Sequence, residues 1–118
     1  ITAYQDQIKS QLVGASAQLI AQQSAVDAEV CAQLAQGVRT RFAVAMGLDE
    51  KLVIGLSTTG VAGPDAVSNK PVGQVFIGIS SSAGVKVFGE QFEGDRLTII
   101  SATVKRCEEI LLEEIGLI

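Results

Sequence analysis

Histidine and tryptophan are absent from these 118 residues, and the chain contains only one tyrosine and four phenylalanines. Without histidine, the commonest general base and metal ligand are missing, so catalysis would have to use Lys, Tyr, Ser, Thr, Asp, Glu or Cys. With few aromatic side chains, a core must be built mainly from Ala, Val, Ile and Leu. Hydrophobic residues still make up 47% of the chain. This composition and length predict one folded domain, residues 1–118.

Basic residues are also scarce, because nine Lys and Arg stand against thirteen Asp and Glu, for a formal charge of -4. A nucleic-acid partner would require a basic face, so this balance argues against one. An anionic small molecule is not excluded, since backbone N–H groups bind phosphate without net positive charge. No hydrophobic run approaches the roughly 18 residues of a membrane span, and no secretion signal is present. We therefore expect a cytoplasmic protein with no membrane partner.

The chain has two cysteines, Cys31 and Cys107, and both lie inside hydrophobic helical patterns. This placement predicts buried, reduced thiols. A nucleophilic cysteine is disfavoured because no histidine is available to activate it.

Hydrophobic spacing and turn residues predict an α/β layered domain with a mixed sheet. The predicted elements are the end of a strand over 1–4, a helix over 5–13, a polar connector over 18–24, a helix over 27–46, a central strand over 52–56, a hairpin over 73–80 and 85–92, and a helix from 94 onward. Two hydrophobic helical stripes are predicted to face the core. They are Val30, Leu34, Val38, Phe42 and Met46 in the first long helix, and Leu97, Ile100, Val104, Cys107 and Leu111 in the last.

A loop over 57–73, with the sequence STTGVAGPDAVSNKPVG, follows the predicted central strand. Ligands of α/β folds usually bind where strands end. Gly60 and Gly63 allow positive φ and close backbone approach, and the loop N–H groups with the Thr58 and Thr59 hydroxyls could bind phosphate. The alternative is a purely structural loop rich in turn residues.

Three further side chains are candidates for chemistry. Tyr4 and Lys9 could point into one pocket across a turn into the first helix, where a buried Lys can serve as a base and a Tyr hydroxyl can relay a proton. Both could instead be ordinary surface residues. Arg96 could pair with a substrate anion, or with Asp95 or a neighbouring Glu.

Several segments together resemble the CinA C-terminal domain family, also called nicotinamide-nucleotide amidase. In that family a TGxAGP motif is followed by KPVGxVxIG, then by F-x-GDR, with Y-x-x-x-x-K upstream. The matching segments here are Thr59–Pro64, Lys70–Gly78, Phe92–Arg96 and Tyr4–Lys9. The resemblance spans nearly the whole chain in the family's order.

The resemblance implies a three-layer α/β/α sandwich that hydrolyses the carboxamide of nicotinamide mononucleotide, without metal or cofactor. It implies a Ser nucleophile, with Lys9 as base and Tyr4 as proton relay. A chain without part of the family's sheet should also be prone to association, so we expect a homo-oligomer. The substrate-binding residues that it suggests are Thr58, Thr59, Gly60, Val61, Ala62, Gly63, Pro64, Gly73 and Arg96.

Three departures from the family pattern qualify this expectation. The family's nucleophilic Ser lies in a segment like ESCTGG, upstream of the Tyr, and no such segment occurs in these residues. The usual glycine-rich run after AGP is replaced by residues 65–69, and an Arg often found after GDR is replaced by Ile100. We expect the family's N-terminal strand and helix, with the Ser, to lie outside this chain. The alternatives are a non-catalytic nucleotide-binding or regulatory module, and an interaction domain using the hydrophobic tail over 108–118.

Overall fold

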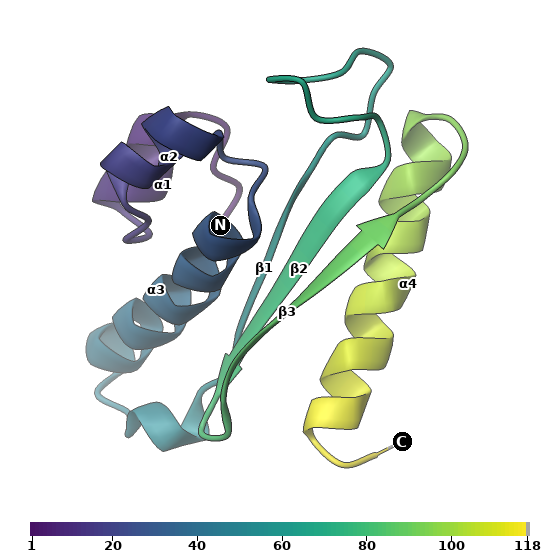
Figure 1. The fold of residues 1–118 in the computed structure, drawn as a ribbon. Coiled ribbons are helices and arrows are strands. Elements are labelled where there is room, and N and C mark those ends of the chain that lie inside the picture. Colours follow the sequence, from purple (N-terminus) through teal and green to yellow (C-terminus); the bar gives the residue numbers. More distant parts are fainter. Residues whose placement is uncertain (118) are drawn as a thin grey trace.

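The computed structural model describes residues 1–117, which form three layers (Figure 1). A sheet lies between one layer that contains the long helix α3 and another formed by α4. The elements are α1 (Asp6–Gln11), α2 (Ala17–Gln23), α3 (Ala28–Met46), the 3-10 helix η1 (Glu50–Leu52), β1 (Gly55–Gly60), β2 (Gln74–Ser81), β3 (Gly84–Gln91) and α4 (Arg96–Glu114). This arrangement confirms the α/β sandwich of three layers.

The sheet has the order β1-β2-β3, and both of its strand pairs are antiparallel. The predicted hairpin is present, with Ser81 paired to Gly84 across a tight turn. The prediction of a mixed sheet is wrong for residues 1–117, where all strand pairs are antiparallel. A mixed sheet would require a parallel neighbour, and the expected strand segment over 1–4 is not a strand here.

Two element boundaries also differ from the prediction. The strand expected over 52–56 begins only at Gly55, because Asp49 caps the short helix η1 by accepting a hydrogen bond from the Lys51 N–H. Residues 58–60 therefore belong to β1 rather than to a loop. The expected connector over 18–24 contains α2, which begins at a Ser16 cap that accepts from the Leu19 N–H.

The helix α3 begins and ends where the sequence predicts. The Asp27 carboxylate caps its first turn, and Gly47 ends it in the left-handed conformation at φ 63°. The helix lies very close to the sheet, because a Cβ on Gly78 would stand 2.8 Å from the Cys31 carbonyl oxygen. The glycine in the central strand thus allows direct contact between helix and sheet backbones.

The predicted hydrophobic stripe of α3 is buried only in its first half. Val30 and Leu34 are buried against Ile20 of α2 and against Val13 and Ala15 between α1 and α2, whereas Phe42 and Met46 are 52% and 61% exposed. Helical periodicity identifies a hydrophobic face, but it does not say how far a neighbour extends along that face.

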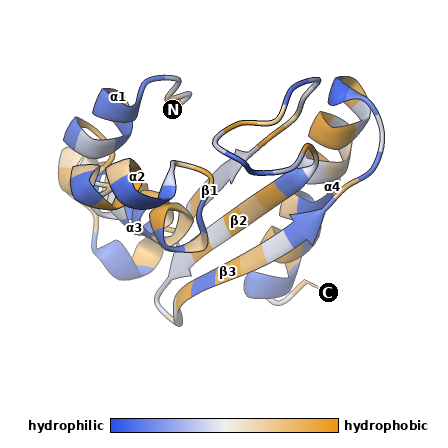
Figure 2. Cartoon of the chain, turned by 45° about the horizontal axis from the view of Figure 1, so that its top comes forward, coloured by the Kyte–Doolittle hydropathy of each residue, from blue (hydrophilic) through white to orange (hydrophobic). Residues whose placement is uncertain are grey.

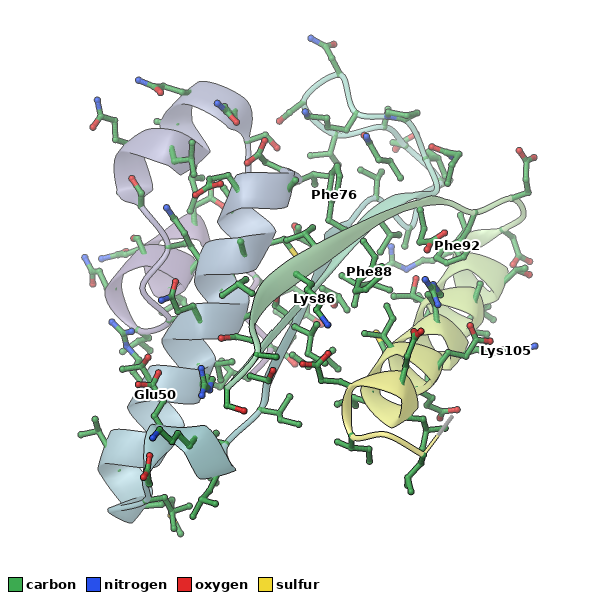
Figure 3. The ribbon with its side chains drawn as sticks, turned by 60° about the horizontal axis from the view of Figure 1, so that its bottom comes forward. Glu50, Phe76, Lys86, Phe88, Phe92 and Lys105 are labelled. Atoms are coloured by element: carbon green, nitrogen blue, oxygen red, sulfur yellow. The ribbon has the colours of Figure 1, made fainter. Side chains whose placement is uncertain are left out.

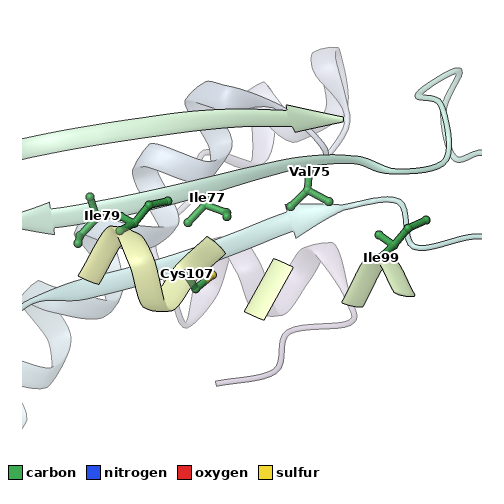
Figure 4. Packing of buried hydrophobic residues seen from close by; sticks show 6 residues of the cluster. Val75, Ile77, Ile79, Ile99 and Cys107 are labelled. Atoms are coloured by element: carbon green, nitrogen blue, oxygen red, sulfur yellow. The ribbon is translucent and has the colours of Figure 1, made fainter. Parts of the chain in front are cut away.

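A second core lies between the sheet and α4 (Figure 4). Hydrophobic colours follow β2, while α1 is mainly polar (Figure 2). The buried members of this core are Val75, Ile77, Ile79, Ile99, Cys107 and Ile110. Phe88 and Phe92 pack against them at the β3 side (Figure 3).

The stripe predicted for α4 is only partly correct. Cys107 is buried, but Leu97 is 74% exposed and Val104 is 52% exposed. The helix instead turns Ile99 and Ile110 toward the sheet. Val104 lines an open groove beside β1, together with Ile100 and Leu111. These members of the predicted stripe therefore lie at the edge of the face that contacts the sheet and not at its centre.

Burial predicts low thiol reactivity in the native protein. Cys31 is fully buried and unpaired, and burial raises the pKa of its thiol to about 11. Because the thiolate is the reactive form, we expect Cys31 in a Cys107→Ala variant to react with Ellman's reagent at pH 8 only after denaturation. Rapid labelling of the native variant would contradict the contact between α3 and the sheet.

The end of α4 is attached to the hairpin through Glu114. The Ser81 hydroxyl donates a hydrogen bond to the Glu114 carboxylate, and the Lys86 Nζ lies 3.0 Å from its other oxygen. These contacts, the hydroxyl first, lower the pKa of Glu114. In Figure 3, the labelled Lys86 lies on the hairpin, beside the helix.

This lowered pKa predicts a pH-dependent stability. The folded-state pKa lies below the unfolded-state pKa, so the stabilisation is complete above the unfolded value and is lost as pH falls through the folded value. We expect Glu114→Gln to lower the free energy of unfolding at pH 7 by roughly 1 kcal/mol or less, as for other solvent-screened pairs. In urea titrations this difference should shrink toward pH 3. The neighbouring Glu113→Gln is the control, and an equal loss there would assign the effect to net charge alone.

Candidate functional site

A cavity of about 980 Å³ lies where α1, the α2–α3 connection, the end of β1 and the following loop meet. This region is at the top of the view in Figure 1. The predicted site residues that line it are Tyr4, Lys9, Thr58, Thr59 and Gly60. Residues separated by half the chain thus line the same cavity, and its volume is within the range of ligand pockets.

Lys9 enters the cavity from α1. Its side chain is only 14% exposed, and its Nζ lies 3.3 Å from the Asp6 carboxylate and 3.4 Å from the backbone oxygen of Tyr4. The Tyr4 residue itself is 89% exposed. Lys9 therefore contacts the Tyr4 backbone, and the predicted relay between the phenol and the amine is not formed in this state.

The position of α1 depends on contacts that the next turn makes with α3. The Ser16 N–H donates to the Gln33 side chain at 2.7 Å, and Arg41 donates to the Val13 carbonyl oxygen at 3.4 Å. A Cβ at Gly37 would overlap that same carbonyl oxygen. Gly37 thus allows the backbone after α1 to lie on α3, and this contact holds Lys9 at the cavity.

The β1 residues contribute two different hydroxyl environments. The Thr59 hydroxyl donates to the Ala25 carbonyl oxygen at 2.7 Å, which attaches the strand to the α2–α3 connection. Thr58 is exposed, and the structure gives its hydroxyl no protein partner within residues 1–117. Thr59 is therefore committed to the fold, and Thr58 has a hydroxyl available for a ligand.

The sequence predicts glycines that allow positive φ and a run of free N–H groups in this loop, and the structure agrees only in part. Gly63 has φ 92°, whereas Gly60 is an extended residue paired with Val75 in the sheet. The Val61 N–H is not free, because it donates to the Gln74 carbonyl oxygen at 3.0 Å. Strand pairing continues past the predicted boundary and uses the donors that a phosphate would need.

The remaining predicted binding residues do not line the cavity. These are Val61, Ala62, Gly63, Pro64, Gly73 and Arg96. The Arg96 guanidinium donates to the Gly63 carbonyl oxygen at 2.9 Å, and so connects the loop to the first turn of α4. Gly73 has φ 90° and packs against the Phe92 carbonyl oxygen, where a side chain would collide. In this structure, these two residues hold the loop in place.

The structure adds seven charged or polar lining residues that the sequence analysis did not select. They are Asp6, Gln22, Gln23, Ser24, Asp27, Ser68 and Lys70. Lys70 stands in the KPVG segment that supports the family resemblance, so that motif could have indicated it. The distances along the chain gave no indication that the second half of the loop folds back toward α1.

The charges around the cavity are partly compensated. Asp6 pairs with Lys9, while the Asp27 carboxylate accepts from the Glu29 and Val30 N–H groups at 2.9 and 3.1 Å. Lys70 takes part in none of the ion pairs formed within residues 1–117. An anionic ligand would meet one cation that has no carboxylate partner.

Within residues 1–117, no helix has the length and hydrophobicity needed to cross a membrane. The same residues contain no cluster of three Cys, Asp or Glu side chains placed to hold a metal ion.

Comparisons with known proteins agree on one family. The family model described as the CinA C-terminal domain matches residues 1–115. A competence-damage inducible protein of Bacillus pumilus is 40% identical over 105 residues, which is 89% of this chain and 23% of that protein. A CinA-like protein of Geobacter metallireducens is 39% identical over 101 residues, covering 85% of this chain and 22% of that protein.

Solved structures of the same superfamily share the fold. The competence-damaged protein (CinA) superfamily protein of Enterobacter cloacae has a TM-score of 0.81 at 18% identity, over 95% of this chain and 62% of that one. The competence/damage inducible protein CihA of Agrobacterium tumefaciens has a TM-score of 0.80 at 24% identity, over 94% of this chain and 64% of that one. The chain spans about a quarter of the length of the curated relatives and under two thirds of these solved chains.

Proposed function

Because the chain belongs to the CinA C-terminal domain family, we propose that it forms part of an amidase that acts on nicotinamide mononucleotide. The reaction converts the carboxamide and water to nicotinic acid mononucleotide and ammonia. The observation that carries the proposal is the shared cavity of Tyr4, Lys9 and residues 58–60. Residues from three separate segments meet there, as an acyl-transfer site requires.

The proposed reaction is acyl transfer in two steps. A Ser hydroxyl, supplied from outside residues 1–118, attacks the carboxamide carbon, with Lys9 as the proposed acceptor of its proton. The Tyr4 hydroxyl relays a proton to the leaving nitrogen, which departs as ammonia. Water then attacks the acyl-Ser ester by the same proton route, and releases the carboxylic acid and the free Ser. In this proposal the Thr58 hydroxyl, which lines the cavity, donates a hydrogen bond to the substrate.

Substrate binding must rearrange the present contacts. Lys9 has to leave Asp6, and the exposed Tyr4 ring has to fold toward the cavity. A solvent-screened pair like Lys9 with Asp6 contributes only about 1 kcal/mol or less, so a bound ligand can replace it. The loop character of residues 1–5 permits the movement of Tyr4.

One observation favours a second candidate, a non-catalytic nucleotide-binding or regulatory module. In this state Lys9 is ion-paired and Tyr4 is exposed, so neither is arranged as a proton-transfer pair. A charged lysine and an exposed ring can hold an anion and stack on a base without breaking a bond.

The deciding experiment is an assay of the full-length protein with nicotinamide mononucleotide. Ammonia should be released in a 1:1 ratio to nicotinic acid mononucleotide, measured by a coupled ammonia assay and by chromatography. Absence of turnover would contradict the amidase. Binding of the nucleotide by calorimetry without turnover would support the binding module.

We also propose that the protein acts in the cytoplasm as a homo-oligomer. The reduced state of both cysteines and the exposed hydrophobic side chains of Phe42, Met46 and Leu52 support these two proposals.

A further inference from the structure

Lys70 lines the cavity and forms no ion pair within residues 1–117. The cavity is lined by two lysines, Lys9 and Lys70, and by two carboxylates, Asp6 and Asp27. Asp6 pairs with Lys9, and Asp27 accepts two N–H groups at the start of α3. None of the ion pairs within residues 1–117 includes Lys70, although the residue is half-buried. An ammonium group at a cavity wall, without a carboxylate partner, favours an anionic ligand.

The backbone holds Lys70 at the cavity wall through a miniature hairpin. Val67 and Lys70 form an isolated antiparallel bridge, and the Lys70 N–H donates to the Val67 carbonyl oxygen at 2.7 Å. The two intervening residues, Ser68 and Asn69, have φ of 49° and 61°, as in the tight turns that join paired strands. Lys70 thus stands at a defined place in a loop that Arg96 also connects to α4.

The two lysines reach the cavity from different walls. Lys9 comes from α1, and Lys70 comes from the loop between β1 and β2 (Figure 1). A mononucleotide has a reacting base at one end and a phosphate at the other. Two lysines on different walls therefore suit a mononucleotide better than they suit a compact anion. Arg96, the cation that the sequence had suggested for this task, is engaged by the Gly63 carbonyl oxygen.

We infer that Lys70 binds the phosphate of the nucleotide and thereby makes the site prefer a phosphomonoester over the corresponding nucleoside. This inference rests on the proposed function of the same cavity. Lys70 does not contact the reacting carboxamide, so its contribution is to substrate affinity and not to the chemical step. A lysine binds phosphate as a point charge, and arginine carries the same positive charge.

The test compares nicotinamide mononucleotide with nicotinamide riboside, which lacks the phosphate. In the full-length protein, Lys70→Ala should weaken binding of the mononucleotide roughly 10- to 100-fold, as expected for loss of a hydrogen bond to a charged group. Binding of the riboside should stay within about twofold, since no interaction with it is removed. Where turnover is measured, KM should rise while kcat is retained. Lys70→Arg should keep the preference, and Lys51→Ala, which removes a lysine outside the cavity, should leave both affinities unchanged.

The outcomes separate this inference from the proposed function. Binding with a phosphate preference that Lys70→Ala abolishes, but without ammonia release, would overturn the amidase and support the phosphate site. Ammonia release with a phosphate preference that survives in Lys70→Ala would support the amidase and overturn the phosphate site. An equal loss of riboside and mononucleotide binding would assign Lys70 to loop structure and also overturn the inference.

Discussion

Replacement of Lys9 by alanine should lower the rate of ammonia release from nicotinamide mononucleotide by about 10²- to 10⁴-fold, the usual contribution of a general base. Lys9 is the one lysine of α1, and its side chain is largely withdrawn into the cavity. Without it, the amine that serves as proton acceptor in the proposed reaction is lost. The measurement is kcat by the coupled ammonia assay, with thermal unfolding to verify that the variant is folded.

Lys9→Arg distinguishes a base from a structural cation. Arginine keeps the positive charge and can still contact Asp6, but it does not release its proton in proteins. We expect Lys9→Arg to be as inactive as Lys9→Ala. Full activity of the arginine variant would contradict the base role and leave Lys9 as an anion-binding group.

Two control variants complete this experiment. Asp6→Asn removes the carboxylate that now holds Lys9 and should affect kcat far less than loss of the amine. Lys105→Ala removes a lysine that points from α4 into solvent (Figure 3) and should have no effect on the rate. A comparable loss in the Lys105 variant would mean that net charge, and not position, controls activity.

The second large effect is expected at Gly37. This residue is buried in α3, and a Cβ there would overlap the carbonyl oxygen of Val13. Gly37→Ala should therefore push the segment after α1 off the helix and destabilise the protein by about 1–3 kcal/mol or more, as overpacking does. Lys9 should shift with this segment, so the rate of ammonia release should also fall.

The sign of this effect makes it informative. Helix propensity alone predicts that alanine in place of glycine stabilises a helix by about 1 kcal/mol. The tertiary contact predicts the opposite, and urea unfolding at pH 7 decides between them. Gly89→Ala in β3 is the control for a glycine-to-alanine change without a collision. The nearest atom to a Cβ on Gly89 would be in the Phe76 ring, at 3.4 Å. A stabilised Gly37→Ala variant would contradict the packing of the segment after α1 on α3.

Local signals in the sequence predicted much of the fold. The long helix over 27–46 and the final helix were predicted correctly at their N-termini, because Asp27 and Asp95 cap them with their side chains. The hairpin was predicted from alternation and turn residues, and its pairing follows that pattern. Each of these signals depends on residues that are close in sequence.

The errors have a common origin in contacts between distant residues. Thr58 and Gly60 were assigned to a loop, because the sequence does not show that β1 continues by pairing with residues 75–77. Phe42 and Leu97 were assigned to the core because periodicity defines a face and not what covers it. The polar connector predicted over 18–24 contains a helix, which packs Ile20 against Val30 and Leu34.

The candidate site divides in the same way. Sequence resemblance selected Tyr4, Lys9 and the start of the loop, because their types and order match a family motif. It could not show that Lys9 contacts the Tyr4 backbone, that Arg96 binds the Gly63 carbonyl oxygen, or that the loop folds back over the cavity.

By itself, the sequence determined the class of fold, the family, both ends of α3, the start of α4 and the absence of histidine chemistry. Those properties follow from composition and from short-range patterns of side chains. Only the tertiary structure decided which polar groups remain available to a ligand. The physical reason is that a polar group is available to a ligand only when no group from a distant part of the chain already binds it. The Thr59 hydroxyl already donates to the Ala25 carbonyl oxygen, whereas Lys70 lines the cavity without an ion-pair partner in the described chain.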